Sequence, residues 1–228
     1  MRALTLFAVL MVLAGCAQQV QSTVTVFHAL PAKGDGATIG IFAGNQANAG
    51  TLEFRSYAEK LAHYLQAAGY TVVDNPAATH PRFVAVFNYG IDDGTLVTET
   101  YAIPRFGVTG YSGSTTTGTI STYGGMSTLN ATTTNVPRYG ITGYNTDTTT
   151  ERVFNRAIVL QIFDSTKFNP NVKDGAKEAQ VYEGKLSSAG SCGSMAGVMD
   201  PLLEALFKDF PGESGKAHTV SVGMQGKC

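Results

Sequence analysis

Along most of the chain, apolar residues alternate with polar ones or form short runs that end at turn residues. Residues 23–30 illustrate the pattern, because Val24, Val26 and Leu30 share one parity of the alternation. A period of two is typical of a strand with one buried face. The same reasoning predicts further strands at 38–42, 70–73, 83–91, 95–101, 153–163, 180–187 and 218–222.

Two segments instead repeat their apolar residues at helical spacing. The first runs from Phe54 to Ala68, with Thr51 placed to cap its start and Gly69 placed to end it. The second runs from Met195 to Phe210, where Pro201 must either kink the helix or occupy its first turn. Two helices among many strands predict an α+β fold, a mostly antiparallel mixed sheet with both helices packed on one face.

Residues 104–150 depart from both patterns. Gly, Ser, Thr, Tyr and Asn dominate the segment, and the sequence Pro104–Tyr111 recurs with few changes as Pro137–Tyr144. Two copies make a duplication rather than a solenoid, which generally needs three or more repeats. We expect an insertion, partly β-hairpin and partly mobile, within a single α+β domain formed by residues 23–103 and 151–228.

The N-terminal sequence predicts where the protein resides in the cell. An uncharged run follows Arg2, is too short to span a bilayer as a helix, and closes with Leu13-Ala14-Gly15-Cys16. This ending resembles the lipobox of bacterial lipoproteins, which implies that residues 1–15 are a signal peptide and that Cys16 becomes the lipidated first residue. The alternative is an ordinary signal peptide with a chance cysteine. Several acyl chains on one residue would form a lasting membrane anchor.

Residues 16–22 would then be the lipidated cysteine and a tether that holds the domain near the membrane. Ala17 stands where an aspartate would, in many Gram-negative lipoproteins, signal retention in the inner membrane. The resemblance therefore implies residence in the cell outer membrane, on its periplasmic face. The tether carries no charged residue, so the lipid rather than electrostatic attraction would hold the protein at the membrane.

Composition narrows the possible partners. The chain has 228 residues, 16 Lys and Arg against 17 Asp and Glu, and a mean hydropathy of +0.02. A net charge of −1 does not suit a nucleic-acid-binding protein, and a single apolar run, at the N-terminus, does not suit a polytopic membrane protein. The membrane, through Cys16, and an envelope protein are the partners we expect.

Four short motifs occur along the chain in the order Thr23–Phe27, Leu52–Ala58, Tyr89–Gly94, and Leu203–Gly212 with Gly215-Lys216. Together they resemble the bacterial lipoproteins grouped as domain-of-unknown-function family 4136. The resemblance covers most of the chain outside the insertion, and it implies a periplasm-facing lipoprotein domain without an assigned activity.

The sequence contains few candidate catalytic or metal-binding residues. Cys192 and Cys228 could form a disulfide in an oxidising compartment or remain independent thiols. A thiol enzyme that uses Cys192 with His218 is an alternative, since Gly190–Ser194 resembles a nucleophile elbow, but the closing glycine is missing. Asp92-Asp93 suits a structural turn better than a metal site. We therefore expect no enzyme activity, cofactor or metal.

The tyrosines of the insertion are better candidates for a functional role, as an interaction surface. Tyrosine among Ser, Gly and Asn is a composition that suits adaptable recognition surfaces. We therefore take Tyr111, Tyr123, Tyr139 and Tyr144 as a candidate interaction surface in a structural or interaction role at the cell envelope. The alternatives are capture of a small ligand or glycan by these aromatic residues, and a merely solvated low-complexity loop.

The lipobox can be tested directly. The variant Cys16→Ala should lose lipidation and move from the membrane fraction to the soluble fraction, because no other feature of the sequence binds it to lipid. Metabolic labelling with palmitate, followed by cell fractionation, measures both effects. The control Cys192→Ala should keep its label, and an unlabelled wild-type protein would favour the ordinary signal peptide.

Overall fold

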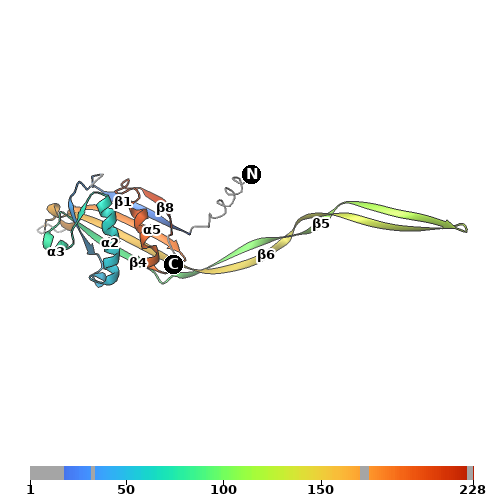
Figure 1. Ribbon diagram of the computed structural model, residues 1–228, viewed down its shortest axis with the longest axis horizontal. Helices are drawn as coiled ribbons and strands as arrows, with labels where there is room; N and C mark the ends of the chain where they lie inside the picture. Colours follow the sequence, from blue (N-terminus) through green and yellow to red (C-terminus); the bar gives the residue numbers. More distant parts are fainter. Residues whose placement is uncertain (1–17, 32–33, 170–174, 225–227) are drawn as a thin grey trace, which may run out of the picture. The chain divides into compact units, whose positions relative to one another are not determined.

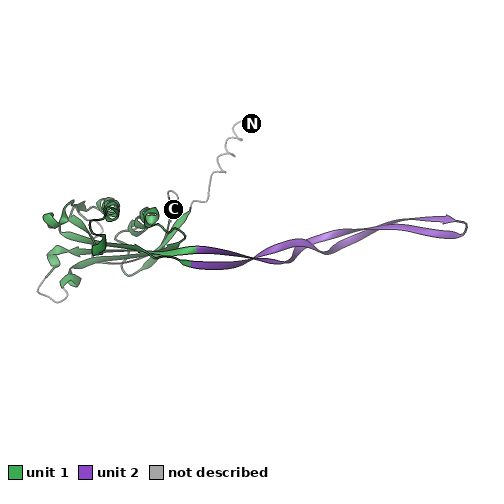
Figure 2. Cartoon of the chain, turned by 90° about the horizontal axis from the view of Figure 1, so that it is seen from below, with its two compact units in different colours: residues 1–95, 152–228 green, residues 96–151 purple. Residues whose placement is uncertain are grey.

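The computed structural model describes residues 18–31, 34–169, 175–224 and 228 (Figure 1). The predicted signal peptide and lipidated Cys16 lie outside these residues. The chain divides into two compact units, residues 1–95 with 152–228 and residues 96–151 (Figure 2). The first unit is the sheet with its helices, and the second is described with the candidate site.

The described residues form one eight-stranded sheet with the order β3-β2-β4-β6-β7-β1-β8, and β5 pairs with β6. The strands are β1 (Gln19–His28), β2 (Thr38–Ala43), β3 (Thr71–Val72), β4 (Phe83–Ile91), β5 (Thr95–Tyr123), β6 (Met126–Asp164), β7 (Gln180–Gly190) and β8 (Ala217–Gly223). β2 runs parallel to β3 and β4, whereas β4, β6, β7, β1 and β8 pair antiparallel. The predicted α+β class with a mostly antiparallel mixed sheet is confirmed.

The helices of the described residues are α2 (Leu52–Ala67), α3 (Pro76–Thr79), α4 (Gly175–Ala179) and α5 (Met195–Phe207), with 3-10 turns at η2 (Gln46–Asn48) and η3 (Ser165–Lys167). The sequence predicted only the two long helices. α3 and α4 contain four and five residues, too few for a helical apolar repeat to be recognised.

The long helices α2 and α5 contact each other and lie on the same face of the sheet (Figure 2). The Thr51 side chain accepts a hydrogen bond from the Phe54 amide at the start of α2, as the sequence predicted. Between the helices, the rings of Tyr64 and Phe207 stack with centroids 5.2 Å apart. Pro201 lies inside α5, so of the two expected placements the structure has the interior one.

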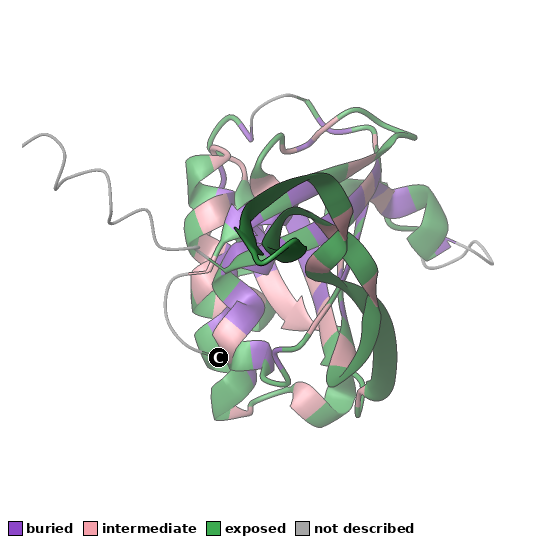
Figure 3. Ribbon diagram, turned by 90° about the vertical axis from the view of Figure 1, so that its right-hand side faces the viewer, coloured by how far each residue is buried: buried purple, intermediate pink, exposed green. Residues whose placement is uncertain are grey.

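The core lies between these helices and the central strands (Figure 3). Ile158, Leu160 and Ile162 of β6 alternate with less buried residues, as a strand with one covered face requires. Opposite them, α5 buries eight of its thirteen residues. This continuous apolar contact is the main stabilising feature of the first unit.

β1 begins four residues earlier than predicted. Gln19 pairs with Gly223 of β8, and Ser22 pairs with both Val220 of β8 and Ser188 of β7. Part of the expected tether, residues 19–22, is therefore strand. The cause is tertiary, because Val20 is buried against the core although the polar residues around it had indicated a linker.

The packing of the core predicts different effects on the free energy of unfolding for alanine substitution of two leucines in α2. Leu65→Ala should lower the free energy of unfolding by about 2–5 kcal/mol, because Leu65 is fully buried and its loss leaves a cavity. Leu52→Ala, at a side chain that is 77% exposed, should change it by no more than about 0.5 kcal/mol. Urea denaturation of both variants measures the difference, and equal effects would contradict this packing.

Candidate functional site

The second unit, Leu96–Glu151, is a two-stranded hairpin built from β5 and β6. β5 ends at Tyr123 and β6 begins at Met126, so only Gly124 and Gly125 turn the chain. Both glycines have positive φ, 60° and 82°, which is the geometry of a type I′ turn and the reason for two glycines here. The insertion was expected to be only partly hairpin, and instead the strands are continuous from Thr95 onward.

The many threonines of the hairpin pair across its strands. The hydroxyl groups of Thr116 and Thr133 lie 2.9 Å apart, and those of Thr122 and Ser127 lie 3.0 Å apart. Cross-strand hydroxyl pairs of this kind each contribute modestly to a sheet. A composition that indicated low complexity is therefore a ladder of paired β-branched residues.

The two copies of the repeat face each other in this hairpin. A Cβ atom added to Gly107 would contact Thr142, and one added to Gly140 would contact Thr109. The Thr109 hydroxyl donates to the carbonyl of Arg138, and the Thr142 hydroxyl donates to the carbonyl of Arg105, both at 3.2 Å. These matched contacts relate the copies by a local two-fold axis near Val108 and Ile141.

The pairing also assigns side chains to the two faces of the hairpin. Because residues of one strand alternate between faces, the contacts across Gly107, Gly118 and Gly140 place six large apolar residues on the same face. We call this set the apolar face, and its members, each 47–74% exposed, are Phe106, Val108, Ile120, Leu129, Tyr139 and Ile141.

The four tyrosines predicted as one interaction surface are therefore divided. Tyr139 belongs to the apolar face, whereas Tyr111, Tyr123 and Tyr144 point to the opposite face by the same alternation. All four are exposed, and Tyr123, beside the turn, is 93% exposed. The low-complexity sequence gave no register from which this division could be predicted.

A two-stranded hairpin is marginal in water unless another surface covers it. The segment has only five charged residues to keep it apart from other surfaces, Glu99, Arg105, Arg138, Asp147 and Glu151. Exposed apolar residues on a nearly uncharged ribbon are the features of a protein-binding surface.

The cysteines are joined. A disulfide links Cys192 to Cys228, with Cα atoms 5.5 Å apart, and so fixes residue 228 to the loop before α5. His218 lies on β8, where its Nε2 atom is 3.9 Å from a carboxylate oxygen of Asp209. The disulfide leaves Cys192 without the free thiolate that the thiol-enzyme alternative requires.

Asp92 has a structural role. Its carboxylate accepts hydrogen bonds from the Asn155 amide and side chain at 2.8 and 2.7 Å, and from the Gly94 amide at 3.1 Å. These bonds lower the pKa of the Asp92 carboxyl, with the Asn155 side chain contributing most. No group of three His, Cys, Asp or Glu residues suited to a metal occurs among the described residues.

One residue that the sequence reasoning missed is Arg156. It occupies the same face of β6 as Ile158 and Leu160, and its side chain is only 3% exposed. The Nε atom is buried without a hydrogen-bond partner, and burial lowers the pKa of the guanidinium. A charged residue in phase with an apolar stripe was the sequence signal that could have identified it.

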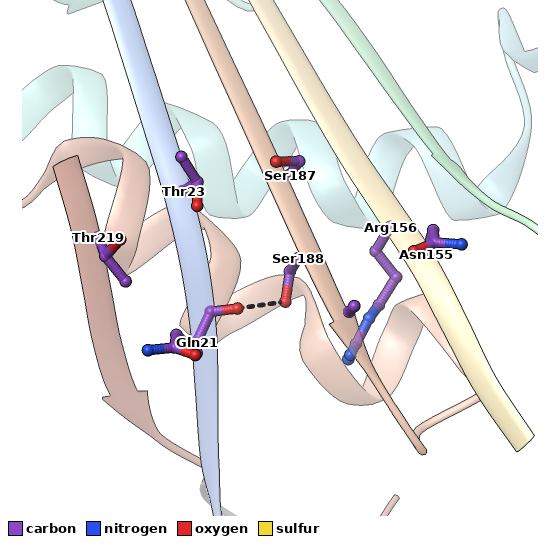
Figure 4. A pocket seen from close by; sticks show the side chains of 8 residues that line it. Gln21, Thr23, Asn155, Arg156, Ser187, Ser188 and Thr219 are labelled. Carbon is purple, nitrogen blue, oxygen red and sulfur yellow. Dashed lines mark hydrogen bonds between the residues drawn. The ribbon is translucent and has the colours of Figure 1, made fainter. Parts of the chain in front are cut away.

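Arg156 lines a pocket of about 380 Å³ at the end of the central strands (Figure 4). In the sheet it stands opposite Ser188 of β7, which stands opposite Ser22 of β1. The Ser188 hydroxyl donates to the carbonyl of Gln21 at 2.7 Å. The other residues of the pocket are Gln21, Thr23, Asn155, Ser187, Ala189 and Thr219. Their side chains are exposed and, by strand alternation, lie on the sheet face opposite to that of Arg156, Ile158 and Leu160.

Comparison with known proteins identifies no family. No protein-family profile matches the chain, and no curated protein matches it. One similar solved structure is a crystal structure of a PDZ domain protein from Parabacteroides distasonis ATCC 8503, with 10% sequence identity and a TM-score of 0.42. The match covers 95% of this chain and 42% of that chain. Within the described residues, no helix combines the length and apolar character needed to cross a membrane.

The hairpin should be dispensable for folding of the first unit. Replacing residues 96–151 by an Asn-Gly turn removes no buried side chain and shortens a connection, so thermal and urea unfolding should show equal or higher stability. Deletion of β8, which carries buried Val220 and Val222, is the contrasting variant and should unfold the protein. Loss of folding without the hairpin would contradict the division into two units.

Proposed function

We propose that this protein is a non-enzymatic lipoprotein of the outer membrane, anchored through Cys16 and facing the periplasm, that binds an envelope protein through residues 96–151. The observation that carries the proposal is the apolar face of the hairpin. The lipobox and the resemblance to domain-of-unknown-function family 4136 support the address.

The energetic argument concerns the six residues of the apolar face. Full burial of one large aliphatic or aromatic side chain stabilises a complex by about 1.5–3 kcal/mol before the costs of association. The hairpin supplies six such residues along one face, together with strand edges that can form further backbone hydrogen bonds. A partner would thus stabilise a ribbon that has little apolar burial of its own.

The remaining features fit a scaffold for this role. Helices α2 and α5 and the sheet form the core of the first unit, and the hairpin is inserted between the core strand β4 and the part of β6 that pairs with it. The disulfide at Cys192 replaces a reactive thiol by a cross-link. An interaction role needs neither a catalytic group nor a cofactor.

Photo-crosslinking in intact cells tests the role. A photoreactive amino acid at Phe106 or Ile141 should form adducts with an envelope protein, because these side chains belong to the apolar face. The same probe at Leu52, which is 77% exposed on α2, is the matched control and should form none.

The double variant Val108→Asp with Ile141→Asp should abolish the adducts while leaving the unfolding temperature of the first unit unchanged. Adducts at Tyr144 alone would favour recognition through the opposite, tyrosine-bearing face. Absence of adducts at every hairpin position would overturn the proposal.

A further inference from the structure

We infer, on the basis of the function proposed above, that the partner adds an extended strand to an outer edge of the hairpin. The edge is that of β5 over residues 104–111, or that of β6 over the repeat of this sequence, residues 137–144. The added strand alternates apolar with polar residues and carries an acidic residue opposite Arg105 or Arg138.

Both outer edges of the hairpin are open over the repeat. Among the described residues, β4 and β7 pair with β6 only within residues 154–164, and β5 pairs with no strand except β6. Figure 1 shows β5 and β6 as a two-stranded ribbon beyond that point. An edge of this kind leaves backbone N–H and C=O groups without partners in the sheet, and it is a template for another strand.

Two side-chain hydrogen bonds show which backbone groups point outward. The Thr142 hydroxyl donates to the Arg105 carbonyl across the hairpin, and the Thr109 hydroxyl donates to the carbonyl of Arg138 in the same way. Both carbonyls therefore point into the hairpin. Because the direction alternates along a strand, the outward N–H and C=O groups are those of the residues between. In the two copies these are Phe106, Val108, Gly110, Tyr139, Ile141 and Gly143.

The prolines of the repeat agree with this assignment. Pro104 and Pro137 occupy the outward position that precedes these residues in each copy, and proline has no N–H to donate. At an outward position the missing N–H removes no hydrogen bond from the hairpin. The next three outward positions carry neither proline nor charge, the residues with which natural proteins protect an edge.

The two faces of the hairpin determine the side chains of the added strand. Side chains that stand opposite each other in neighbouring strands share a face. A residue that pairs with Phe106 or Val108 therefore adds its side chain to the apolar face, where burial favours an apolar one. Gly110 leaves open space at the next such position, since an added Cβ atom would meet nothing within 4 Å. The residues between these three meet the opposite face and should be polar.

The charge of the added strand follows from the two arginines. Arg105 and Arg138 are exposed, and they are the only charged residues between Pro104 and Tyr144. Each immediately precedes a member of the apolar face, so both lie on the opposite face. A carboxylate opposite either guanidinium would form a charge-assisted hydrogen bond, whereas a cation there would be repelled.

Binding of a labelled peptide to the full chain tests strand addition. The probe is end-capped, alternates valine with threonine, and has one terminal threonine replaced by glutamate; fluorescence anisotropy measures its affinity. Val108→Pro with Ile141→Pro removes one outward N–H from each edge. This pair should bind about tenfold more weakly than the matched control, Val108→Ala with Ile141→Ala, which loses the same side chains but keeps both N–H groups.

Hydrogen exchange locates the added strand without any substitution. The outward amides of Phe106, Val108 and Gly110 should gain protection when the peptide binds, because they become hydrogen-bonded. The inward amides of Arg105 and Thr109 should be protected with or without the peptide. Their protection in the proline pair shows that the hairpin itself persists, so that weaker binding reports the loss of the edge.

Reversal of charge tests the acidic residue. A second peptide has lysine in place of the glutamate. At low ionic strength the wild type should prefer the glutamate peptide about threefold, and Arg105→Glu with Arg138→Glu should prefer the lysine peptide. Equal binding of both peptides by the wild type would contradict an acidic partner.

Equal affinities of the proline and alanine pairs, or binding without protection of the outward amides, would mean contact through side chains alone and would refute strand addition. So would a wild type that binds neither peptide. Protection of the same amides that rises with protein concentration, without peptide, would identify a second copy of this chain as the occupant and overturn the acidic partner. Crosslinks at Phe106 that persist in the proline pair would refute strand addition only, and leave the proposed function standing.

Discussion

Burial of one sheet face beneath α5 and α2 constrains almost everything else in the first unit. The strands β1, β7, β6 and β4 present alternate residues to the helices, and α5 covers them with a nearly continuous apolar surface. Every polar residue on that face must therefore be accommodated individually. Ser188 is satisfied by a backbone carbonyl, Asp164 by its neighbours, and Arg156 by no described group.

The hairpin, unlike the first unit, has no face covered by helices. None of its residues between Leu96 and Glu151 is buried, so its geometry depends on backbone pairing, a two-glycine turn and hydroxyl contacts between threonines. β-branched residues favour an extended backbone without requiring a core. This explains how a segment with few leucines can remain regular over its length, and why its apolar residues remain available to other molecules.

The sequence predicted the elements that bury an apolar face better than the features that depend on contacts between distant segments. Where apolar periodicity was strong, as in α2, α5 and β6, the sequence predicted the elements well, and Thr51 and Gly69 marked the ends of α2. It failed where tertiary contacts decide, as for residues 19–22 of β1, and it left open whether Cys192 pairs with Cys228, which the structure shows joined. The pairing register of the hairpin depends on the neighbouring strand, which no local pattern encodes. The burial of Arg156, in contrast, could have been predicted from its phase with Ile158 and Leu160.

The facing copies of the repeat have a consequence for stoichiometry. The local two-fold axis near Val108 and Ile141 makes the edge of β5 over Pro104–Tyr111 equivalent to the edge of β6 over Pro137–Tyr144. A molecule that recognises one edge meets similar residues, in the same chain direction, on the other, where Tyr139 and Ile141 replace Phe106 and Val108. One hairpin thus presents two similar sites, and a binder that tolerates both replacements would saturate it at two molecules per chain.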